Sequence, residues 1–321
     1  MLLEGLGAGF IGMDSSITPT RFAGFKLVQT TDFFYPVTDD PYVHGMITCA
    51  NVLSDLYAMG VSTCDNMLML LTLPRDMPDA DRHRSARLVM DGFHEAARRA
   101  GTKVTGGQTV RGPWFMSGGV ASAVVQDSEL PALDDARAGD VLVLTKPLGT
   151  QVAINVNTWL SDEAKFGRIA HILTRDQAKA AFATATLSMV RLNQTAARLM
   201  VKYGARAATD VTGFGIVGHA RTLAGNQRRQ VDLRITALPV IQGMDKVDAV
   251  VSYRLSQGLS AETSGGLLIA LPPETAAAFM DELQAIDGWP AFVVGRVEEG
   301  DGGASLANPE WITCAWRAES A

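Results

Sequence analysis

The sequence has few cysteines, only Cys49, Cys64 and Cys314 among 321 residues. Their spacing fits neither a zinc site nor a framework of paired disulfides. Such a chain is typical of a reducing, intracellular compartment. The first residues also lack the basic segment that opens a signal peptide, since the first Lys or Arg is Arg21. We therefore expect a cytoplasmic protein.

Long hydrophobic runs and clusters of positive charge are missing as well. The longest apolar run covers residues 67–73, far short of the roughly 20 residues that span a bilayer as a helix. The net charge is −6, and the densest basic stretches are the adjacent pairs Arg98–Arg99 and Arg228–Arg229. Because nucleic-acid-binding domains carry a dense basic patch, we expect neither a nucleic acid nor a membrane as a partner.

Common signatures of nucleotide binding and nucleophilic catalysis are also absent from the sequence. It contains no Gly-x-x-x-x-Gly-Lys-Ser/Thr loop and no recognisable Ser–His–Asp order. The five histidines show no metal-ligand spacing. His219 follows a glycine-rich turn, and we expect it to satisfy a local hydrogen bond rather than to act in catalysis.

The composition is that of an ordinary folded protein, 47% hydrophobic and 19% charged, and the length allows two cores. Strand-like and helical patterns alternate, which predicts the α+β class. The polar segment 126–140 indicates a boundary between a domain of residues 1–128 and one of residues 129–321. Strands are expected at 25–31, 67–73, 120–125, 141–145, 264–270 and 291–297, and helices at 46–59, 79–100, 180–202, up to about 226 and from 273.

The segment Asp210-Val-Thr-Gly-Phe-Gly215 carries the strongest local signal. A carboxylate leads into a glycine-rich turn and then into an apolar helix, whose first N–H groups attract phosphate. Gly213 and Gly215 would let an anion approach the backbone closely. Asp210 would hold the Mg²⁺ that bridges to the phosphate. The alternative is a strand-end Asp before an ordinary helix cap.

Further carboxylates recur beside small or apolar residues. Asp14 lies among small residues, and Asp32 ends an apolar run. Thr48, Asn51 and Asp55 form a polar stripe on a helix, and the apolar flanks of this stripe argue against simple exposure. An acidic protein that binds ATP must offset the triphosphate charge, and this set of Asp residues favours a metal ion.

Three other segments offer weaker signals. Thr105-Gly-Gly-Gln-Thr109 has paired glycines that suit an anion site, or a plain hairpin turn. Lys146 follows a predicted strand and could reach a phosphate, although a surface lysine beside a turn is more common. The segment 262–266 is either a second turn of the same pocket or an ordinary tight turn.

In this order the motifs resemble the selenophosphate synthetase (selenide, water dikinase) family, within the aminoimidazole ribonucleotide synthetase superfamily. The residues that make up these motifs resemble those of the eukaryotic branch of the family. The resemblance covers residues 12–297 and depends on the blocks Gly12–Asp14, Gln29–Asp32, Cys49–Gly60, Thr105–Thr109, Leu144–Gly149, Ala208–Gly215 and Glu262–Gly266.

The resemblance implies a two-domain aminoimidazole ribonucleotide synthetase-like fold whose N-terminal domain binds ATP and dimerises through its β-strands. It implies a reaction that converts selenide, ATP and water to selenophosphate, AMP and phosphate. ATP and selenide are then the substrates, Mg²⁺ is the cofactor, and the assembly is a homodimer. The implied magnesium ligands are Asp14, Asp55 and Asp210.

The family's nucleotide contacts carry over to a second set of residues. Asp32 is the implied direct contact, and Thr30 and Asn51 are further candidates for the same groove. The resemblance also implies that one short strand lines the ATP site, from the same or from the partner subunit. Its residues are Gly106, Gly107, Gln108 and Thr109.

One departure from the family pattern concerns the catalytic groups. The family has a glycine-rich N-terminal segment with Cys or selenocysteine and a nearby Lys, whereas here no Cys precedes Cys49 and no Lys precedes Lys26. We therefore expect a truncated core with impaired activity, and we name no catalytic residue. The alternatives are a regulatory nucleotide-binding homodimer, or another ATP-dependent enzyme of the superfamily, which the blocks 106–109 and 208–215 argue against.

Overall fold

The computed structural model describes residues 14–315 and divides the chain into two compact units. The N-terminal unit extends to residue 132 and includes residues 192–201, and the C-terminal unit comprises residues 133–191 and everything from 202 onward. The domain boundary predicted after residue 128 stays a prediction. No helix of the described part is long and apolar enough to cross a membrane.

A five-stranded sheet forms the base of the N-terminal unit, with the strand order β1-β2-β5-β3-β4. All neighbouring pairs are antiparallel except β3 and β4. The strands are β1 Ser16–Pro19, β2 Phe25–Phe34, β3 Asn66–Pro74, β4 Val104–Gly112 and β5 Met116–Gln126.

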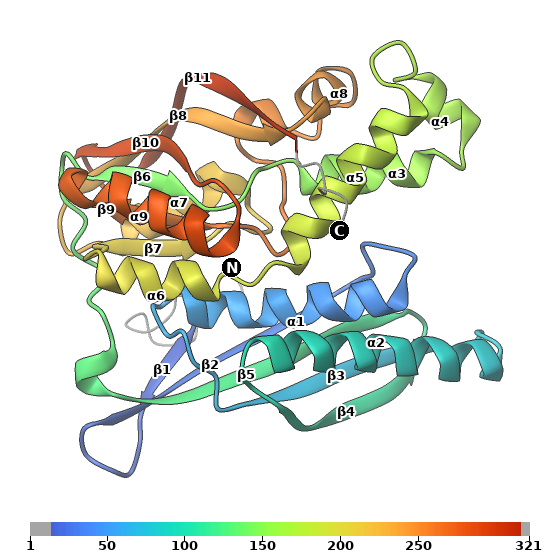
Figure 1. The fold of residues 1–321 in the computed structure, drawn as a ribbon, viewed down its shortest axis with the longest axis horizontal. Coiled ribbons are helices and arrows are strands. Elements are labelled where there is room, and N and C mark those ends of the chain that lie inside the picture. Colours follow the sequence, from blue (N-terminus) through green and yellow to red (C-terminus); the bar gives the residue numbers. More distant parts are fainter. Residues whose placement is uncertain (1–13, 316–321) are drawn as a thin grey trace. The chain divides into compact units, whose positions relative to one another are not determined.

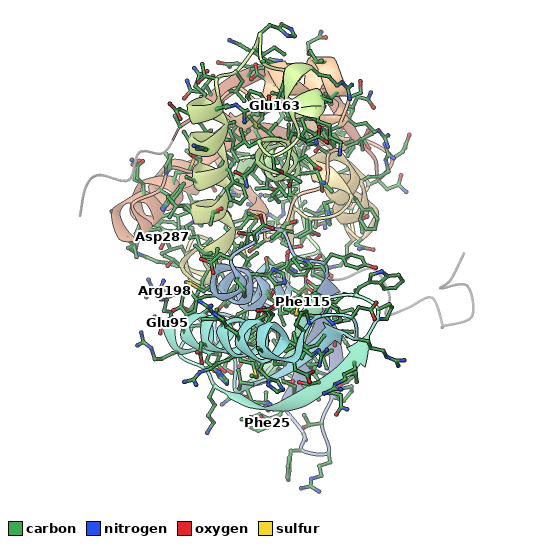
Figure 2. The ribbon with its side chains drawn as sticks, turned by 90° about the vertical axis from the view of Figure 1, so that its right-hand side faces the viewer. Phe25, Glu95, Phe115, Glu163, Arg198 and Asp287 are labelled. Atoms are coloured by element: carbon green, nitrogen blue, oxygen red, sulfur yellow. The ribbon has the colours of Figure 1, made fainter. Side chains whose placement is uncertain are left out.

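Two helices, α1 Pro41–Ala58 and α2 Asp79–Arg99, cover one face of this sheet (Figure 1). The carboxylate of Asp40 accepts the first N–H groups of α1, so the helix begins five residues before its predicted start. Gly45 and Gly92 allow the two helices to touch, because a Cβ at either would collide with backbone of the other helix. Glu95, which is labelled in Figure 2, belongs to α2. It accepts hydrogen bonds from Arg98 and Arg99 of the same helix.

The opposite face of the sheet has no helix over it within the described part of the unit. Strand β3 shows the reason for a two-faced sheet, since its buried and half-buried residues alternate along its whole length. Its half-buried set includes Leu68 and Leu70, and the neighbouring strand adds Val120 and Val124. Val124 is 52% exposed. Among the described residues of the unit, this helix-free face is therefore a partly exposed apolar surface.

The C-terminal unit contains a six-stranded mixed sheet with the order β11-β8-β10-β6-β9-β7 and helices packed around it (Figure 1). Strand β9 is wholly buried, which explains its unbroken apolar sequence. The strands are β6 Val141–Leu144, β7 Ala207–Asp210, β8 Val231–Ile241, β9 Leu267–Leu271, β10 Phe292–Glu299 and β11 Ala304–Cys314. The helices are α3 Thr150–Trp159, α4 Glu163–Gly167, α5 Arg175–Val190, α7 Gly215–Gly225, α8 Met244–Val251 and α9 Pro273–Asp287, with short 3₁₀ turns at Asp127–Glu129 and Leu255–Gln257.

The structure corrects two of the predicted elements. The single helix predicted over 180–202 is broken, because α5 ends at Val190, Arg191 is extended, and α6 Gln194–Lys202 begins anew. The side chain of Asn193 in the break donates to Ser54 Oγ of α1, 3.0 Å away. The paired glycines of 105–109 form no hairpin turn but lie within the edge strand β4.

Candidate functional site

Two carboxylates meet at the β1–β2 side of the N-terminal unit. Oxygens of Asp14 and Asp55 lie within 4.8 Å of each other, and both residues line an open pocket with Ser16, Gln29 and Thr30. The Thr30 hydroxyl donates to Asp55 Oδ2. Two carboxylates so close repel each other unless a proton or a cation lies between them. Their oxygens are also the ligands that Mg²⁺ prefers, so the pair fits a divalent cation.

The nucleotide candidates Asp32 and Asn51 lie next to this pair. Alternate residues of β2 face α1, so Thr30 and Asp32 point the same way, and Asn51 and Asp55 lie one helical turn apart. Asn51 Nδ2 donates to Asp32 Oδ2 at 2.6 Å. Burial raises the pKa of Asp32, and the Asn51 hydrogen bond opposes that shift. The predicted polar stripe of α1 is thus buried against β2 rather than solvated.

The polar stripe of α1 continues to His44, which was not predicted as a site residue. Thr48 Oγ1 donates to the His44 carbonyl and lies 2.8 Å from Ser117 Oγ, which in turn lies 2.8 Å from His44 Nε2. A hydroxyl has one proton. Ser117 therefore donates to Thr48 and accepts from His44, which places a proton on Nε2 of the ring. Burial lowers the pKa of His44 to about 4, so the ring is neutral at neutral pH. The sequence signal that could have indicated His44 is its position one helical turn before Thr48, on the same face of the helix.

The segment Gly106–Thr109 lies elsewhere in the same unit. It forms part of β4, the edge strand, and lines a separate pocket with Met69, Met90 and His94. Three strand steps separate β4 from β2, or about 14 Å at the usual spacing of a sheet. Within one subunit, the sheet therefore keeps Gly106–Thr109 apart from Asp14, Thr30 and Asp55.

In the C-terminal unit, Asp210 ends β7 and is 2% exposed. The turn after it differs from the prediction of an open anion cradle. His219 Nε2 accepts the N–H groups of Thr212 and Phe214, at 3.0 and 3.3 Å. The N–H of Gly215 donates to Thr212 O. That of Val217 donates to Gly258 O, also within the unit. These four N–H groups are therefore already used within the unit. The local role predicted for His219 is confirmed.

The side chains of Lys146 and Glu262 lie near that turn and are buried. Lys146 is 1% exposed, and its Nζ donates to Arg191 O at 2.6 Å and Ser264 O at 2.8 Å. It is neither the surface lysine nor the phosphate ligand that its position suggested. Glu262 accepts the N–H groups of Gly149 and Thr150 at the start of α3. Burial lowers the pKa of Lys146 and raises that of Glu262 to about 7.

The buried histidines predict how stability depends on pH. Burial lowers the pKa of both His44 and His219 to about 4, whereas a histidine in an unfolded chain titrates near about 6.5. As the pH falls, the unfolded chain therefore takes up protons first. Each neutral ring's contribution is complete above about pH 6.5 and is lost between about pH 6.5 and 4, by up to about 3 kcal/mol.

Urea unfolding at about pH 7 and about pH 5 tests this expectation. His219→Gln keeps an acceptor for the turn but cannot titrate, so the C-terminal unit should lose less stability on acidification than in the wild type. His171→Gln removes an exposed histidine of the same unit and serves as the control. Equal acid sensitivity in His219→Gln and the wild type would contradict the assignment.

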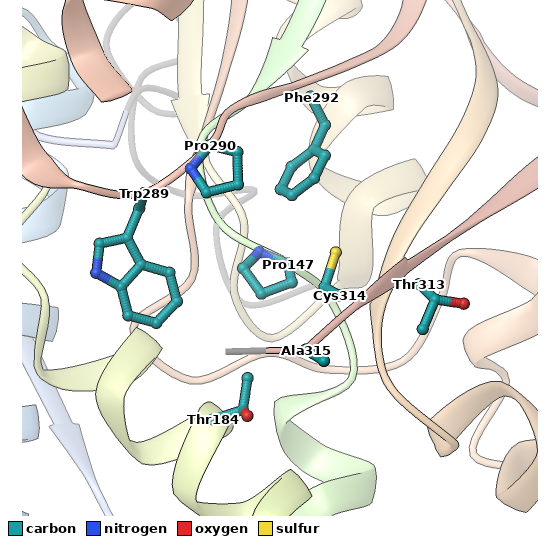
Figure 3. Close-up of a pocket in the computed structure, with 8 residues that line it drawn as sticks. All are labelled: Pro147, Thr184, Trp289, Pro290, Phe292, Thr313, Cys314 and Ala315. Carbon is teal, nitrogen blue, oxygen red and sulfur yellow. The ribbon is translucent and has the colours of Figure 1, made fainter. Parts of the chain in front are cut away.

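A further pocket in the C-terminal unit contains none of the predicted site residues. Pro147, Trp289, Phe292 and Cys314 line it (Figure 3), and its walls are mainly apolar. Burial raises the pKa of the Cys314 thiol to about 12, so it stays protonated at neutral pH. This pocket lacks the carboxylates and hydroxyls that a metal–nucleotide site requires.

Comparison with known proteins places the chain in a family. The N-terminal domain of AIR synthase related proteins matches residues 13–125, and their C-terminal domain matches residues 137–307. A thiamine-monophosphate kinase structure from Aquifex aeolicus shares 19% identity, with a TM-score of 0.71 over 98% of this chain and 96% of that one. A structure of hydrogenase maturation protein HypE in complex with ATP shares 18% identity, with a TM-score of 0.65 over 95% of this chain and 88% of that one. These likenesses establish an α+β fold of the AIR synthase related class.

The relatives found by sequence identify the family more narrowly than the similar folds do. Selenide, water dikinase from Dictyostelium discoideum is 50% identical over 298 residues, which cover 92% of this chain and 82% of that protein. Human selenide, water dikinase 2 is 50% identical over 295 residues, which cover 91% of this chain. The chain belongs to the selenide, water dikinase family, also called selenophosphate synthetases. It spans 66% of the human relative's length, just under two thirds.

Proposed function

We propose that the chain forms the ATP- and metal-binding core of an enzyme that makes selenophosphate, AMP and phosphate from selenide, ATP and water. The observation that carries this proposal is the Asp14–Asp55 carboxylate pair, with Thr30 bonded to Asp55 and the Asp32–Asn51 pair beside it. The relatives at 50% identity are named for the same activity.

The donor set suits magnesium. Asp14 and Asp55 would hold it, and Asp210 is proposed as a third ligand because the resemblance to the family implies it. When bound, Mg²⁺ would offset the charge that develops on phosphate oxygens as two phosphoanhydride bonds break. Thr30 keeps the Asp55 carboxylate in place, and the Asn51–Asp32 pair presents a fixed polar contact to the nucleotide. One phosphorus atom would then gain a bond to selenium and leave as selenophosphate. Another would gain an oxygen atom from water and leave as phosphate, and AMP would remain.

Phosphorus NMR of the protein with ATP, Mg²⁺ and selenide tests the proposal. We expect selenophosphate, AMP and phosphate to form in equal amounts, and no selenophosphate without selenide or Mg²⁺. A parallel reaction with thiamine monophosphate in place of selenide examines the nearest alternative chemistry in the superfamily. Formation of ADP and thiamine diphosphate there, with no AMP from selenide, would overturn the assignment.

The helix-free face of the N-terminal unit supports a homodimer. Leu68, Leu70, Val120 and Val124 form an apolar surface of the kind that proteins cover. A second copy on that face could also bring its Gly106–Thr109 strand to the Asp14–Asp55 pocket, which the sheet order prevents within one subunit. The three cysteines are free thiols, which supports the predicted cytoplasmic location.

Light scattering should give twice the mass of the chain at micromolar concentration. Val124→Glu places a charge on the apolar face and should shift the protein towards monomers, with little effect on folding because the side chain is exposed. Arg84→Glu changes an exposed residue of α2, on the opposite side of the sheet, and should leave the dimer intact. A monomeric wild type would refute the assembly.

A further inference from the structure

Glu262 is a buried carboxylate of the C-terminal unit that is not among the proposed ligands of the metal or the nucleotide. Its side chain accepts three hydrogen bonds, and the residue is only 5% exposed. Oε1 accepts the N–H of Gly149 at 2.7 Å, and Oε2 accepts the N–H of Thr150 at 2.8 Å. The Thr150 hydroxyl also donates to Oε2. A buried charge is costly unless its hydrogen bonds are made, so these bonds explain how the carboxylate is tolerated.

The three donors belong to the start of α3. An α-helix leaves its first N–H groups without partners inside the helix, and a Ser, Thr or Asp at the N-cap usually accepts one of them. Here the N-cap is Gly149, with φ +103°, and a Cβ at this position would lie 3.3 Å from the side chain of Met244. A local cap is therefore disfavoured. Glu262 supplies the acceptor from 113 positions later in the chain, so the cap ties a distant segment to α3.

That segment, residues 258–266, lies along the turn that follows Asp210. A Cβ on Gly265 would lie 1.9 Å from Val211 O, so the two backbones touch there. The next strand begins at Leu267, which pairs with Asp210 itself. Three backbone hydrogen bonds join the segment to the turn, from Val217 N–H to Gly258 O at 3.0 Å, from Glu262 N–H to Thr212 O at 3.0 Å, and from Val211 N–H to Gly266 O at 2.9 Å. The position of the segment therefore sets the position of the turn.

Glu262 and Thr150 form the link between this segment and α3. The Thr150 hydroxyl donates to Glu262 and accepts the N–H of Thr263 at 3.1 Å, so it holds two consecutive residues of the segment. Glu262 is bonded to α3 through its carboxylate and to Thr212 through its backbone N–H. A shift of the carboxylate would therefore move the backbone two residues after Asp210.

We propose that Glu262 is a positioning residue, which fixes the turn that presents Asp210 to magnesium by linking that turn to the start of α3. The inference rests on the proposed function, because it requires Asp210 to be a ligand of the metal. Replacing a residue that orients a metal ligand typically lowers metal affinity by about 10- to 100-fold. Glu262 acts through the backbone rather than on the ligand itself, so we expect an effect of about tenfold, at the lower end of that range.

Glu262→Gln tests the inference, because it keeps the size of the side chain but replaces one acceptor oxygen with an NH₂ group that only donates. Hydrogen exchange of the metal-free protein, followed by mass spectrometry, should become faster in the turn 211–217. Calorimetric titration with Mg²⁺, in the presence of a non-hydrolysable ATP analogue, should give a Kd about tenfold higher than in the wild type. In turnover assays the half-saturating Mg²⁺ concentration should rise similarly, while kcat at saturating Mg²⁺ stays within about threefold.

Two variants of Thr150 and one core variant separate the link from a general loss of stability. Thr150→Val removes the hydroxyl and should resemble Glu262→Gln. Thr150→Ser keeps the hydroxyl and should retain the wild-type Kd for Mg²⁺. This pair also decides the question if Glu262→Gln does not fold. Val294→Ala creates a cavity in β10 of the same unit, at a position that is 0% exposed, and should lower the urea midpoint without changing the Kd for Mg²⁺.

The outcomes distinguish this inference from the proposed function. Unchanged exchange and an unchanged Kd in Glu262→Gln would refute the positioning role and leave the function standing. Faster exchange with an unchanged Kd would refute it too, because Glu262 would then serve only the fold. The same rise in Kd in Val294→Ala would attribute the effect to lost stability and have the same consequence. A wild type that makes no selenophosphate would refute the proposed function, and the inference with it.

Discussion

Asp55→Asn should reduce magnesium-dependent ATP turnover by a factor on the order of 10² to 10³, the loss typical of one electrostatic group in an active site. The substitution keeps the shape of the side chain and an oxygen that can accept from Thr30. It removes the negative charge that, together with Asp14, makes the pocket attractive to a divalent cation. The fold should therefore survive while metal binding weakens, so higher Mg²⁺ concentrations should recover part of the activity.

Turnover measured against Mg²⁺ concentration, together with thermal unfolding, checks this result. Asp91→Asn changes an exposed carboxylate on α2 and should leave turnover unaffected. Asp210→Asn extends the test to the C-terminal unit and should resemble Asp55→Asn if the two residues share the metal. Full activity in Asp210→Asn would remove Asp210 from the ligand set. Full activity in Asp55→Asn would remove the basis of the whole site.

Gly215→Ala should destabilise the C-terminal unit by about 3 kcal/mol or more and should also impair turnover. A left-handed backbone costs a residue with a Cβ roughly 1–2 kcal/mol. The added carbon would also lie 2.6 Å from Gly258 O and 2.7 Å from Ser260 O, which are backbone atoms with little freedom to move. Relief of that clash requires the turn to shift, and the turn directly follows Asp210.

Gly213 provides a matched control in the same turn. A Cβ there would have no atom within 4 Å, and its φ lies outside the left-handed range. Gly213→Ala should therefore change the free energy of unfolding by less than about 1 kcal/mol. Urea unfolding of the two variants side by side measures the difference. Similar stabilities would show that the enclosure of Gly215 is not maintained in solution.

The predicted helices and strands agree with the structure where the local pattern of apolar residues is strong. The strands at 25–31, 120–125 and 141–145 and the helix at 79–100 agree with β2, β5, β6 and α2. The predicted helix over 180–202 failed because α5 and α6 have compatible apolar spacing, and propensity alone does not reveal a break. Arg191 and Asn193 interrupt it through tertiary contacts, the former bonded to Thr145 O and the latter to Ser54. The long strands β8 and β11 were also missed.

Some features of the candidate site were likewise predictable from the sequence, and others were not. Asp14, Thr30, Asp32, Asn51 and Asp55 were named from the sequence, and the fold brings them to one side of β2 and α1. Gly106–Thr109 were named too, but their place on an edge strand follows from the sheet order. Ser117 gave no local signal, and His44 gave only its position one helical turn before Thr48. The hydrogen bond between Ser117 and His44 joins residues that are far apart in the sequence.

The sequence by itself determined the family, the two α+β domains and the chemical nature of the site, because motif order and periodicity are local properties of the chain. Only the tertiary structure decided that Lys146 is buried and bonded to Ser264 O. It also decided that His219 Nε2 accepts the N–H groups of Thr212 and Phe214 in the turn after Asp210. The physical reason is that burial and hydrogen-bond partners depend on residues far away in the chain. A carboxylate, an amine or a glycine turn has the same sequence signal whether it faces a ligand or the protein core.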